Sequence, residues 1–139
     1  PDKLSIQIET MYEKKYKMSC TEGFIGEGVY VQNKNYKQYN SQHYLKKIKR
    51  KYKNTKYLRF NKYPENFTYD FLKIHNCIIT SSVVVEKKLF DNMGKFRNLP
   101  LSADYDCWLG LLQLTNCIYI DIPLFYYDFL HAEGRNYFK

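Results

Sequence analysis

The sequence contains no run of about 20 apolar residues, the length that a helix needs to cross a membrane, so we expect no membrane segment in this chain. Its first residues also lack the apolar core of a secretion signal. Because the chain opens on Pro1 instead, we expect it to be a fragment of a longer protein. No internal repeat is visible, and 139 residues are the size of one ordinary domain.

Paired cysteines are missing as well, since no C-x-x-C motif occurs and no histidine stands at zinc-ligand spacing. We therefore expect no zinc site. Each of the four cysteines lies in or beside an apolar run; they are Cys20, Cys77, Cys107 and Cys117. This pattern predicts buried, reduced thiols and a cytoplasmic protein, and a disulfide stays open as the alternative.

Acidic residues are absent from positions 34–62, where eleven lysines and arginines occur. The rest of the chain has eleven cationic and fourteen acidic side chains, so the net charge of +8 comes from this segment. Tyrosines alternate with the lysines, and that composition suits phosphate contact and base stacking in a nucleic-acid-binding surface. A solvated lysine-rich face has the same composition. We prefer this second interpretation, so the expected partners include no nucleic acid.

Apolar spacing and turn residues together predict an α/β chain. Helical spacing marks segments at 1–15, 41–53, 86–93 and within 99–112. Strand patterns occur at 17–21, 29–31, 77–85, 116–121 and 124–129. A turn with Gly23, Gly26 and Gly28 separates the first two strands, and Pro123 separates the last two. The segment 77–85, CIITSSVVV, has no polar face, which predicts a strand buried on both sides.

The segment 99–112, LPLSADYDCWLGLL, carries two carboxylates at the start of a helical pattern. Asp104 and Asp106 fall in the first turn, where the partial positive charge of a helix N-terminus favours an ionised carboxylate. Such a carboxylate suits a general base. Aspartate is also an ordinary helix-capping residue, so the position alone does not distinguish catalysis from capping.

Four segments between 76 and 127 carry a family resemblance. They are TSSVVV at 80–85, LF followed by GKF within 89–96, DYDCWL at 104–109 and PLFYY at 123–127. In this order they resemble the second half of the family 2 glycosyltransferases of the GT-A fold. The opening PDKL, followed by Gln7 and Ile8, is similar to the helix that comes directly after the Asp-x-Asp metal motif in that family. The chain departs from the family pattern at Ala103, usually Glu, and at Gly110, often Arg.

The resemblance implies a partial GT-A fold, a mixed sheet with flanking helices whose N-terminal nucleotide-binding half is absent from this chain. Residues 1–139 would then form one domain, the acceptor-side half of the enzyme, with a variable basic insertion at residues 33–68. The intact enzyme would transfer a sugar from a nucleotide-sugar donor to a hydroxyl of a glycan, protein or lipid acceptor, with inversion. A divalent metal, Mn or Mg, would assist this displacement. The isolated chain is expected to be inactive.

Each site residue takes its role from the same resemblance. Asp104 is the expected catalytic base. The sugar pocket is expected to include Ser81, Ser82, Asp106 and Trp108. Two alternatives stay open: packing of the small strand residues, and support of the helix end by Asp106. His131 is a candidate metal ligand or an exposed tail histidine, and the main metal ligands are expected before Pro1. Two other functions stay open: a GT-A-like binding module without turnover, and a basic nucleic-acid-binding domain.

Overall fold

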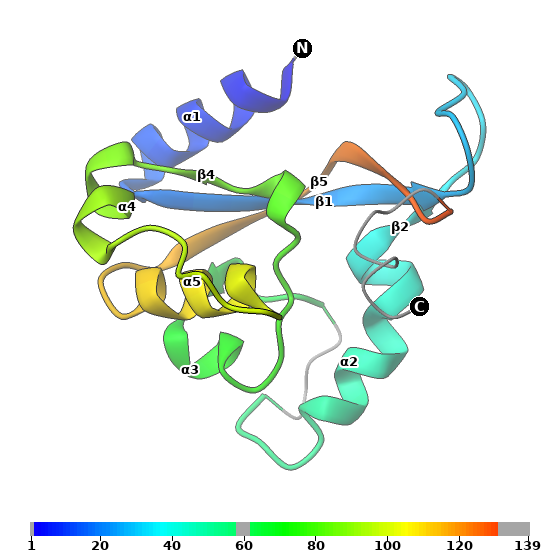
Figure 1. Ribbon diagram of the computed structural model, residues 1–139. Helices are drawn as coiled ribbons and strands as arrows, with labels where there is room; N and C mark the ends of the chain where they lie inside the picture. Colours follow the sequence, from blue (N-terminus) through cyan, green and yellow to red (C-terminus); the bar gives the residue numbers. More distant parts are fainter. Residues whose placement is uncertain (1, 58–61, 131–139) are drawn as a thin grey trace.

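The computed structural model describes residues 2–57 and 62–130, which form an α/β structure with a mixed sheet and flanking helices (Figure 1). Its two long strands, β1 (Met18–Gly26) and β5 (Cys117–Asp128), lie side by side and run parallel. Three short strands pair antiparallel with them: β2 (Lys37–Gln38) and β4 (Val84–Val85) with β1, and β3 (Asn66–Phe67) with β5.

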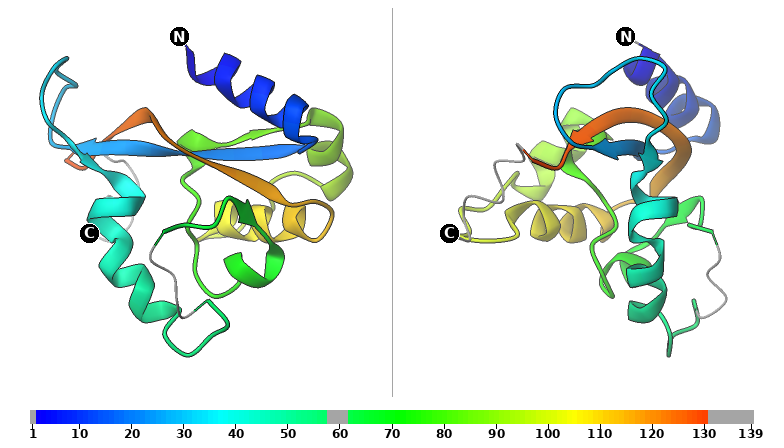
Figure 2. Two further views of the ribbon diagram at one scale, coloured as in Figure 1. Left: turned by 180° about the vertical axis from the view of Figure 1, so that it is seen from behind. Right: turned by 90° about the vertical axis from the view of Figure 1, so that its right-hand side faces the viewer.

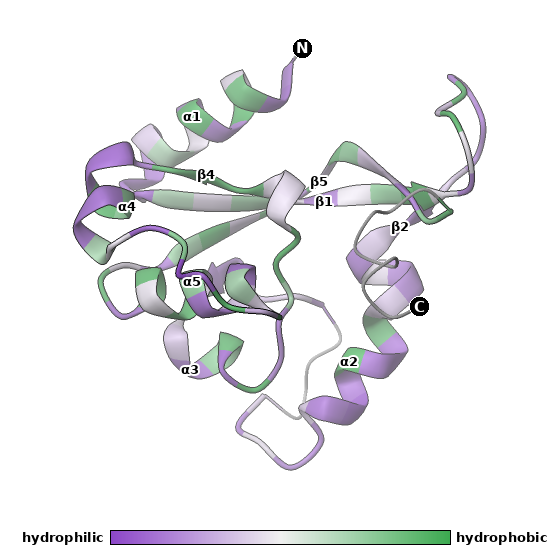
Figure 3. Ribbon diagram, in the orientation of Figure 1, coloured by the Kyte–Doolittle hydropathy of each residue, from purple (hydrophilic) through white to green (hydrophobic). Residues whose placement is uncertain are grey.

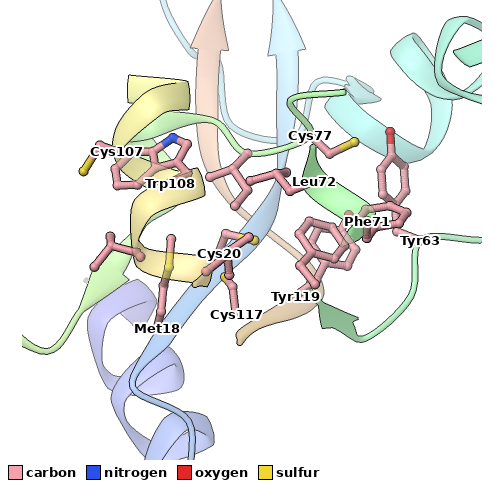
Figure 4. Close-up of a cluster of buried hydrophobic side chains, with 14 of the residues drawn as sticks. Met18, Cys20, Tyr63, Phe71, Leu72, Cys77, Cys107, Trp108, Cys117 and Tyr119 are labelled. Carbon is pink, nitrogen blue, oxygen red and sulfur yellow. The ribbon is translucent and has the colours of Figure 1, made fainter. Parts of the chain in front are cut away.

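Helices cover both sides of this sheet. In Figure 1 and Figure 2, α1 (Asp2–Lys14) lies on one side, and α2 (Leu45–Lys51), α3 (Tyr69–Leu72) and α5 (Ala103–Leu112) lie on the other. The hydrophobic core lies on this second side, where residues of both long strands meet α3 and α5 (Figure 4). Its fully buried members include Met18, Phe71, Leu72, Leu111 and Cys117. None of the described helices has the length and apolar character of a membrane span.

Several sequence-based predictions are confirmed. The helices expected at 1–15 and within 99–112 are α1 and α5, and the helix expected at 86–93 is α4 (Lys87–Met93). Gly94 ends α4 in the left-handed conformation, at φ 94°, as a helix-terminating glycine does. All four cysteines are buried and free, so the alternative of a disulfide is excluded in this structure.

The prediction of a buried strand at 77–85 is wrong. The chain instead makes a 3-10 turn, η2 (Thr80–Ser82), and only β4 pairs, at the edge of β1, where both valines are half-buried. The Ser82 hydroxyl donates a 2.7 Å hydrogen bond to the carbonyl of Ile79. Serine and threonine offer the backbone such local bonds in place of a sheet ladder, which explains the interruption of a β-branched run.

The glycine-rich turn is also misplaced, because Gly23 and Gly26 lie inside β1 and residues 29–31 form no strand. Gly23 packs under the ring of Phe125 on β5. A Cβ atom at this position would lie 2.3 Å from the ring Cζ atom. The glycine therefore allows a close approach between side chain and backbone in the sheet, rather than a turn.

Pro123 does not separate two strands, since β5 runs continuously through it. The parallel pairing of β1 and β5 is irregular there: Glu22 stands opposite Pro123, with register shifts on both sides of Glu22. A proline has no N–H to donate to a ladder and is accommodated at such a bulge. One bulged strand thus replaces the two predicted ones.

The basic segment 33–68 contains β2 and β3 in addition to the predicted helix. After β2, the chain makes a π-helical turn, η1 (Tyr39–Tyr44), which continues directly into α2. The helix predicted at 41–53 is therefore confirmed in kind but begins with a wider turn. Such π-helical turns occur frequently at functional sites.

Candidate functional site

A cleft of about 470 Å³ lies between the η1–α2 helix and the segment that leads from α3 to η2. Figure 1 shows this helix and this segment facing each other below the sheet. The cleft is lined on the helix side by Tyr39, Tyr44 and Lys47, and on the opposite side by His75 to Ser81 and by Asp104. Charged and hydroxyl groups from three distant parts of the chain therefore meet around one space.

Asp104 is held at the start of α5 by its own surroundings. One carboxylate oxygen accepts a 2.7 Å hydrogen bond from the backbone N–H of Tyr105, and the other accepts a 3.2 Å bond from the hydroxyl of Thr80. Ser102 precedes the helix in a left-handed conformation and makes no side-chain cap, so the carboxylate serves the N-terminal end in its place. The carboxylate is half-buried and lines the cleft.

The opposite wall is basic. The ammonium of Lys47 lies 5.8 Å from the centre of the Tyr44 ring, a cation–π arrangement that holds it beside the cleft. Burial, together with the positive charges of Lys47 and Lys51, lowers the pKa of His75 below its ordinary value. His75 is consequently a neutral imidazole at neutral pH, a group that can donate or accept a hydrogen bond.

Cys77 also lines the cleft, but its chemistry is different. Burial raises the pKa of its thiol to about 12, so the sulfur stays protonated at neutral pH and is a poor nucleophile. The side chain of Tyr52 lies 3.5 Å from this sulfur. Among the lining residues, Asp104 and the neutral imidazole of His75 are therefore the groups that can accept a proton from a bound hydroxyl.

The structure separates the residues that the resemblance brought together. Ser81 is exposed and lines the cleft together with Asp104. Ser82 is buried beneath it, and its carbonyl accepts a 2.9 Å hydrogen bond from Gln7 of α1. Trp108 is buried in the core, with its ring centre 5.7 Å from that of Phe96. Neither Ser82 nor Trp108 lines the cleft, because both side chains serve internal packing.

Asp106 also lies away from the cleft. Its carboxylate accepts two hydrogen bonds from the guanidinium of Arg97, one of them a 2.7 Å bond from Nε, and this pairing holds the pKa of Asp106 below its usual range. The pair ties the loop after α4 to the first turn of α5. Asp106 thus supports the helix end, the alternative role considered for it, while His131 lies outside the described residues.

The cleft was tested as a site for the divalent metal that the resemblance implies. Its lining side chains include Asp104 and His75 but no further carboxylate or imidazole. Within residues 2–57 and 62–130, no three His, Cys, Asp or Glu side chains form a group that could hold a metal ion. The described residues do not fit a metal centre, so the metal stays a prediction about ligands expected before Pro1 and about His131.

Glu22 is a residue whose importance the sequence analysis missed. It is fully buried in β1, and four donors surround its carboxylate. The backbone N–H groups of Gly23, Asn40 and Ser41 donate at 2.8, 2.8 and 2.9 Å, and the hydroxyl of Tyr119 donates at 3.1 Å. Two of these N–H groups belong to the first turn of η1. Glu22 therefore anchors the N-terminal end of the helix that forms the basic wall.

Sequence reasoning also missed Lys47 and His75 as site residues. The composition of the basic segment predicts a solvated lysine-rich face, and His75 stands alone between two predicted elements. The available signal was the uncompensated charge of residues 34–62. That charge cannot by itself show which lysine faces a cavity.

Compared with family models, with curated proteins and with solved structures, the chain shows no match.

Proposed function

We propose that this chain is the acceptor side of a family 2-like glycosyltransferase of the GT-A fold, with the cleft as its acceptor site. The observation that carries the proposal is the position of Asp104. Asp104, in the DYDCWL motif, lies in the first turn of α5 and lines the cleft. Its carboxylate accepts a hydrogen bond from Thr80, which belongs to the TSSVVV segment. Two of the four motifs that carry the resemblance thus meet at one place.

In the proposed reaction, Asp104 accepts the proton of an acceptor hydroxyl as the hydroxyl oxygen attacks the anomeric carbon of a nucleotide sugar. The bond from that carbon to the nucleotide diphosphate breaks, and the configuration inverts. Thr80 holds one carboxylate oxygen, and the backbone N–H of Tyr105 holds the other. The donor nucleotide and the Mn or Mg ion are assigned to the half of the enzyme that carries the Asp-x-Asp motif.

The test is Asp104→Asn in the full-length enzyme. Asparagine keeps the shape and an oxygen for the capping bond but cannot accept the proton, so kcat should fall by about 10²–10⁴-fold while donor binding stays nearly unchanged. Asp106→Asn is the matched control, because it removes a carboxylate from the same helical turn outside the cleft. Its effect on kcat should be much smaller.

A folded Asp104→Asn enzyme that binds donor and keeps kcat within about threefold of wild type would contradict the proposal. The chain would then be better described as a binding module without turnover. The proposal also expects no sugar transfer by the 139-residue chain alone, measured with labelled nucleotide sugars.

A further inference from the structure

The cleft has an uneven distribution of charge between its two walls. The single carboxylate among its lining side chains is Asp104, and the opposite wall is formed by α2, five of whose seven residues are cationic. In Figure 3, most of the α2 ribbon has the colour of hydrophilic residues. A ligand in this cleft therefore meets a negative group at one end and positive potential at the other.

Lys47 is the cation of this wall that lines the cleft. Within the described parts of the chain it makes no ion pair, and its contact is with the ring of Tyr44. His75 lies close enough to Lys47 and Lys51 for their charges to act on its titration. An anionic group bound here would be attracted by Lys47 and could accept a hydrogen bond from the imidazole of His75.

We infer that the acceptor is a saccharide that carries an anionic group, a phosphate or a carboxylate, bound beside Lys47 and His75 with its reacting hydroxyl toward Asp104. The inference rests on the proposed function and adds the substrate class. Repulsion between the anion and the Asp104 carboxylate favours this orientation over the reverse one. A volume of about 470 Å³ is within the range of small-ligand pockets, and Tyr39 and Tyr44 provide aromatic surface for a sugar ring.

Binding of small sugars and of phosphate tests the inference without requiring turnover. Glucose 6-phosphate, glucuronate, glucose and inorganic phosphate are titrated into the protein and followed by NMR, with the His75 imidazole as reporter. We expect glucose 6-phosphate or glucuronate to shift the His75 signal and to bind at least about fivefold more tightly than glucose or inorganic phosphate. The two anionic sugars distinguish phosphate from carboxylate.

Lys47→Ala and Lys46→Ala form the matched pair, because both remove one exposed lysine from α2 and only Lys47 lines the cleft. Lys47→Ala should weaken binding of the anionic sugar about fivefold, and Lys46→Ala should change it less than twofold, since its charge is further from the ligand and screened. Both changes are at the surface and should leave the fold intact, which circular dichroism checks.

Three results would overturn the inference. One is equal binding of glucose and the anionic sugars. Another is an equal loss in the two lysine variants, which would show a general attraction of polyanions to α2, as a nucleic-acid-binding surface produces. The third is binding of inorganic phosphate as tight as that of glucose 6-phosphate. None of these results bears on the kinetics of Asp104→Asn, so failure of the inference is distinguishable from failure of the proposed function.

Discussion

Replacing Glu22 by glutamine should destabilise the protein and loosen the helix that forms the basic wall of the cleft. The carboxylate accepts from three backbone N–H groups and one phenol, all of which donate. Glutamine retains one oxygen, which can serve Gly23 and Asn40. Its amide NH₂ then occupies the place of the oxygen that accepts from Ser41 and Tyr119. The Tyr119 hydroxyl can turn and accept, but the Ser41 N–H cannot.

The expected cost follows from these bonds. One charge-assisted hydrogen bond is lost, and the part-buried N–H of Ser41 is left facing another donor, an effect of about 2–3 kcal/mol. The bonds from Gly23 and Asn40 change from charge-assisted to neutral, which adds about 1 kcal/mol to the loss of stability. Glutamine is uncharged, so the cost of burying a charge disappears and offsets part of this loss. The net loss in free energy of unfolding is about 2–3 kcal/mol, which corresponds to a fall in Tm of roughly 6–10 °C for a chain of this size.

Urea unfolding followed by circular dichroism measures the loss, with Glu27→Gln as the matched control. Glu27 is exposed just after β1, and its replacement should change stability by less than about 0.5 kcal/mol. Hydrogen exchange at the amides of Asn40 and Ser41 should accelerate selectively in Glu22→Gln. If Glu22→Gln is as stable as Glu27→Gln and these amides keep their protection, Glu22 does not anchor this helix.

Two other predictions concern the loops and the sheet. Arg97→Ala should lower Tm at pH 7 and have no effect on Tm well below pH 4, as measured by thermal melts across the pH range. The pairing with Arg97 depresses the pKa of Asp106, so it stabilises the fold above the ordinary carboxyl pKa. This contribution disappears as the pH falls through the depressed pKa. Gly23→Ala should cost about 1–3 kcal/mol in urea unfolding because its Cβ would overlap the Phe125 ring, whereas Gly110→Ala should be nearly neutral, since its Cβ would meet only the flexible end of a methionine. Equal stability of the two alanine variants would contradict this account.

Local sequence was sufficient where the physical cause is local. The apolar spacing at 1–15 and 86–93 predicts α1 and α4 correctly, because helix formation depends on residues three and four apart. The same reasoning places Asp104 and Asp106 in the first turn of α5. Burial of the cysteines also follows from their apolar neighbours. These features require no knowledge of what the chain packs against.

Tertiary structure decided the features that depend on distant partners. The β-branched run at 77–85 predicts a buried strand, but only Val84 and Val85 pair with β1, and the residues before them form a turn with a local serine hydrogen bond. In the sequence, Glu22 is an ordinary polar residue. In the fold, its carboxylate accepts a hydrogen bond from the first turn of η1, eighteen residues away. Asp104, Lys47 and His75 share a cleft although they lie on separate elements. The sequence determines the chemical groups of each residue. The neighbours of a residue in space, which set its charge environment and its function, are determined only when the chain folds.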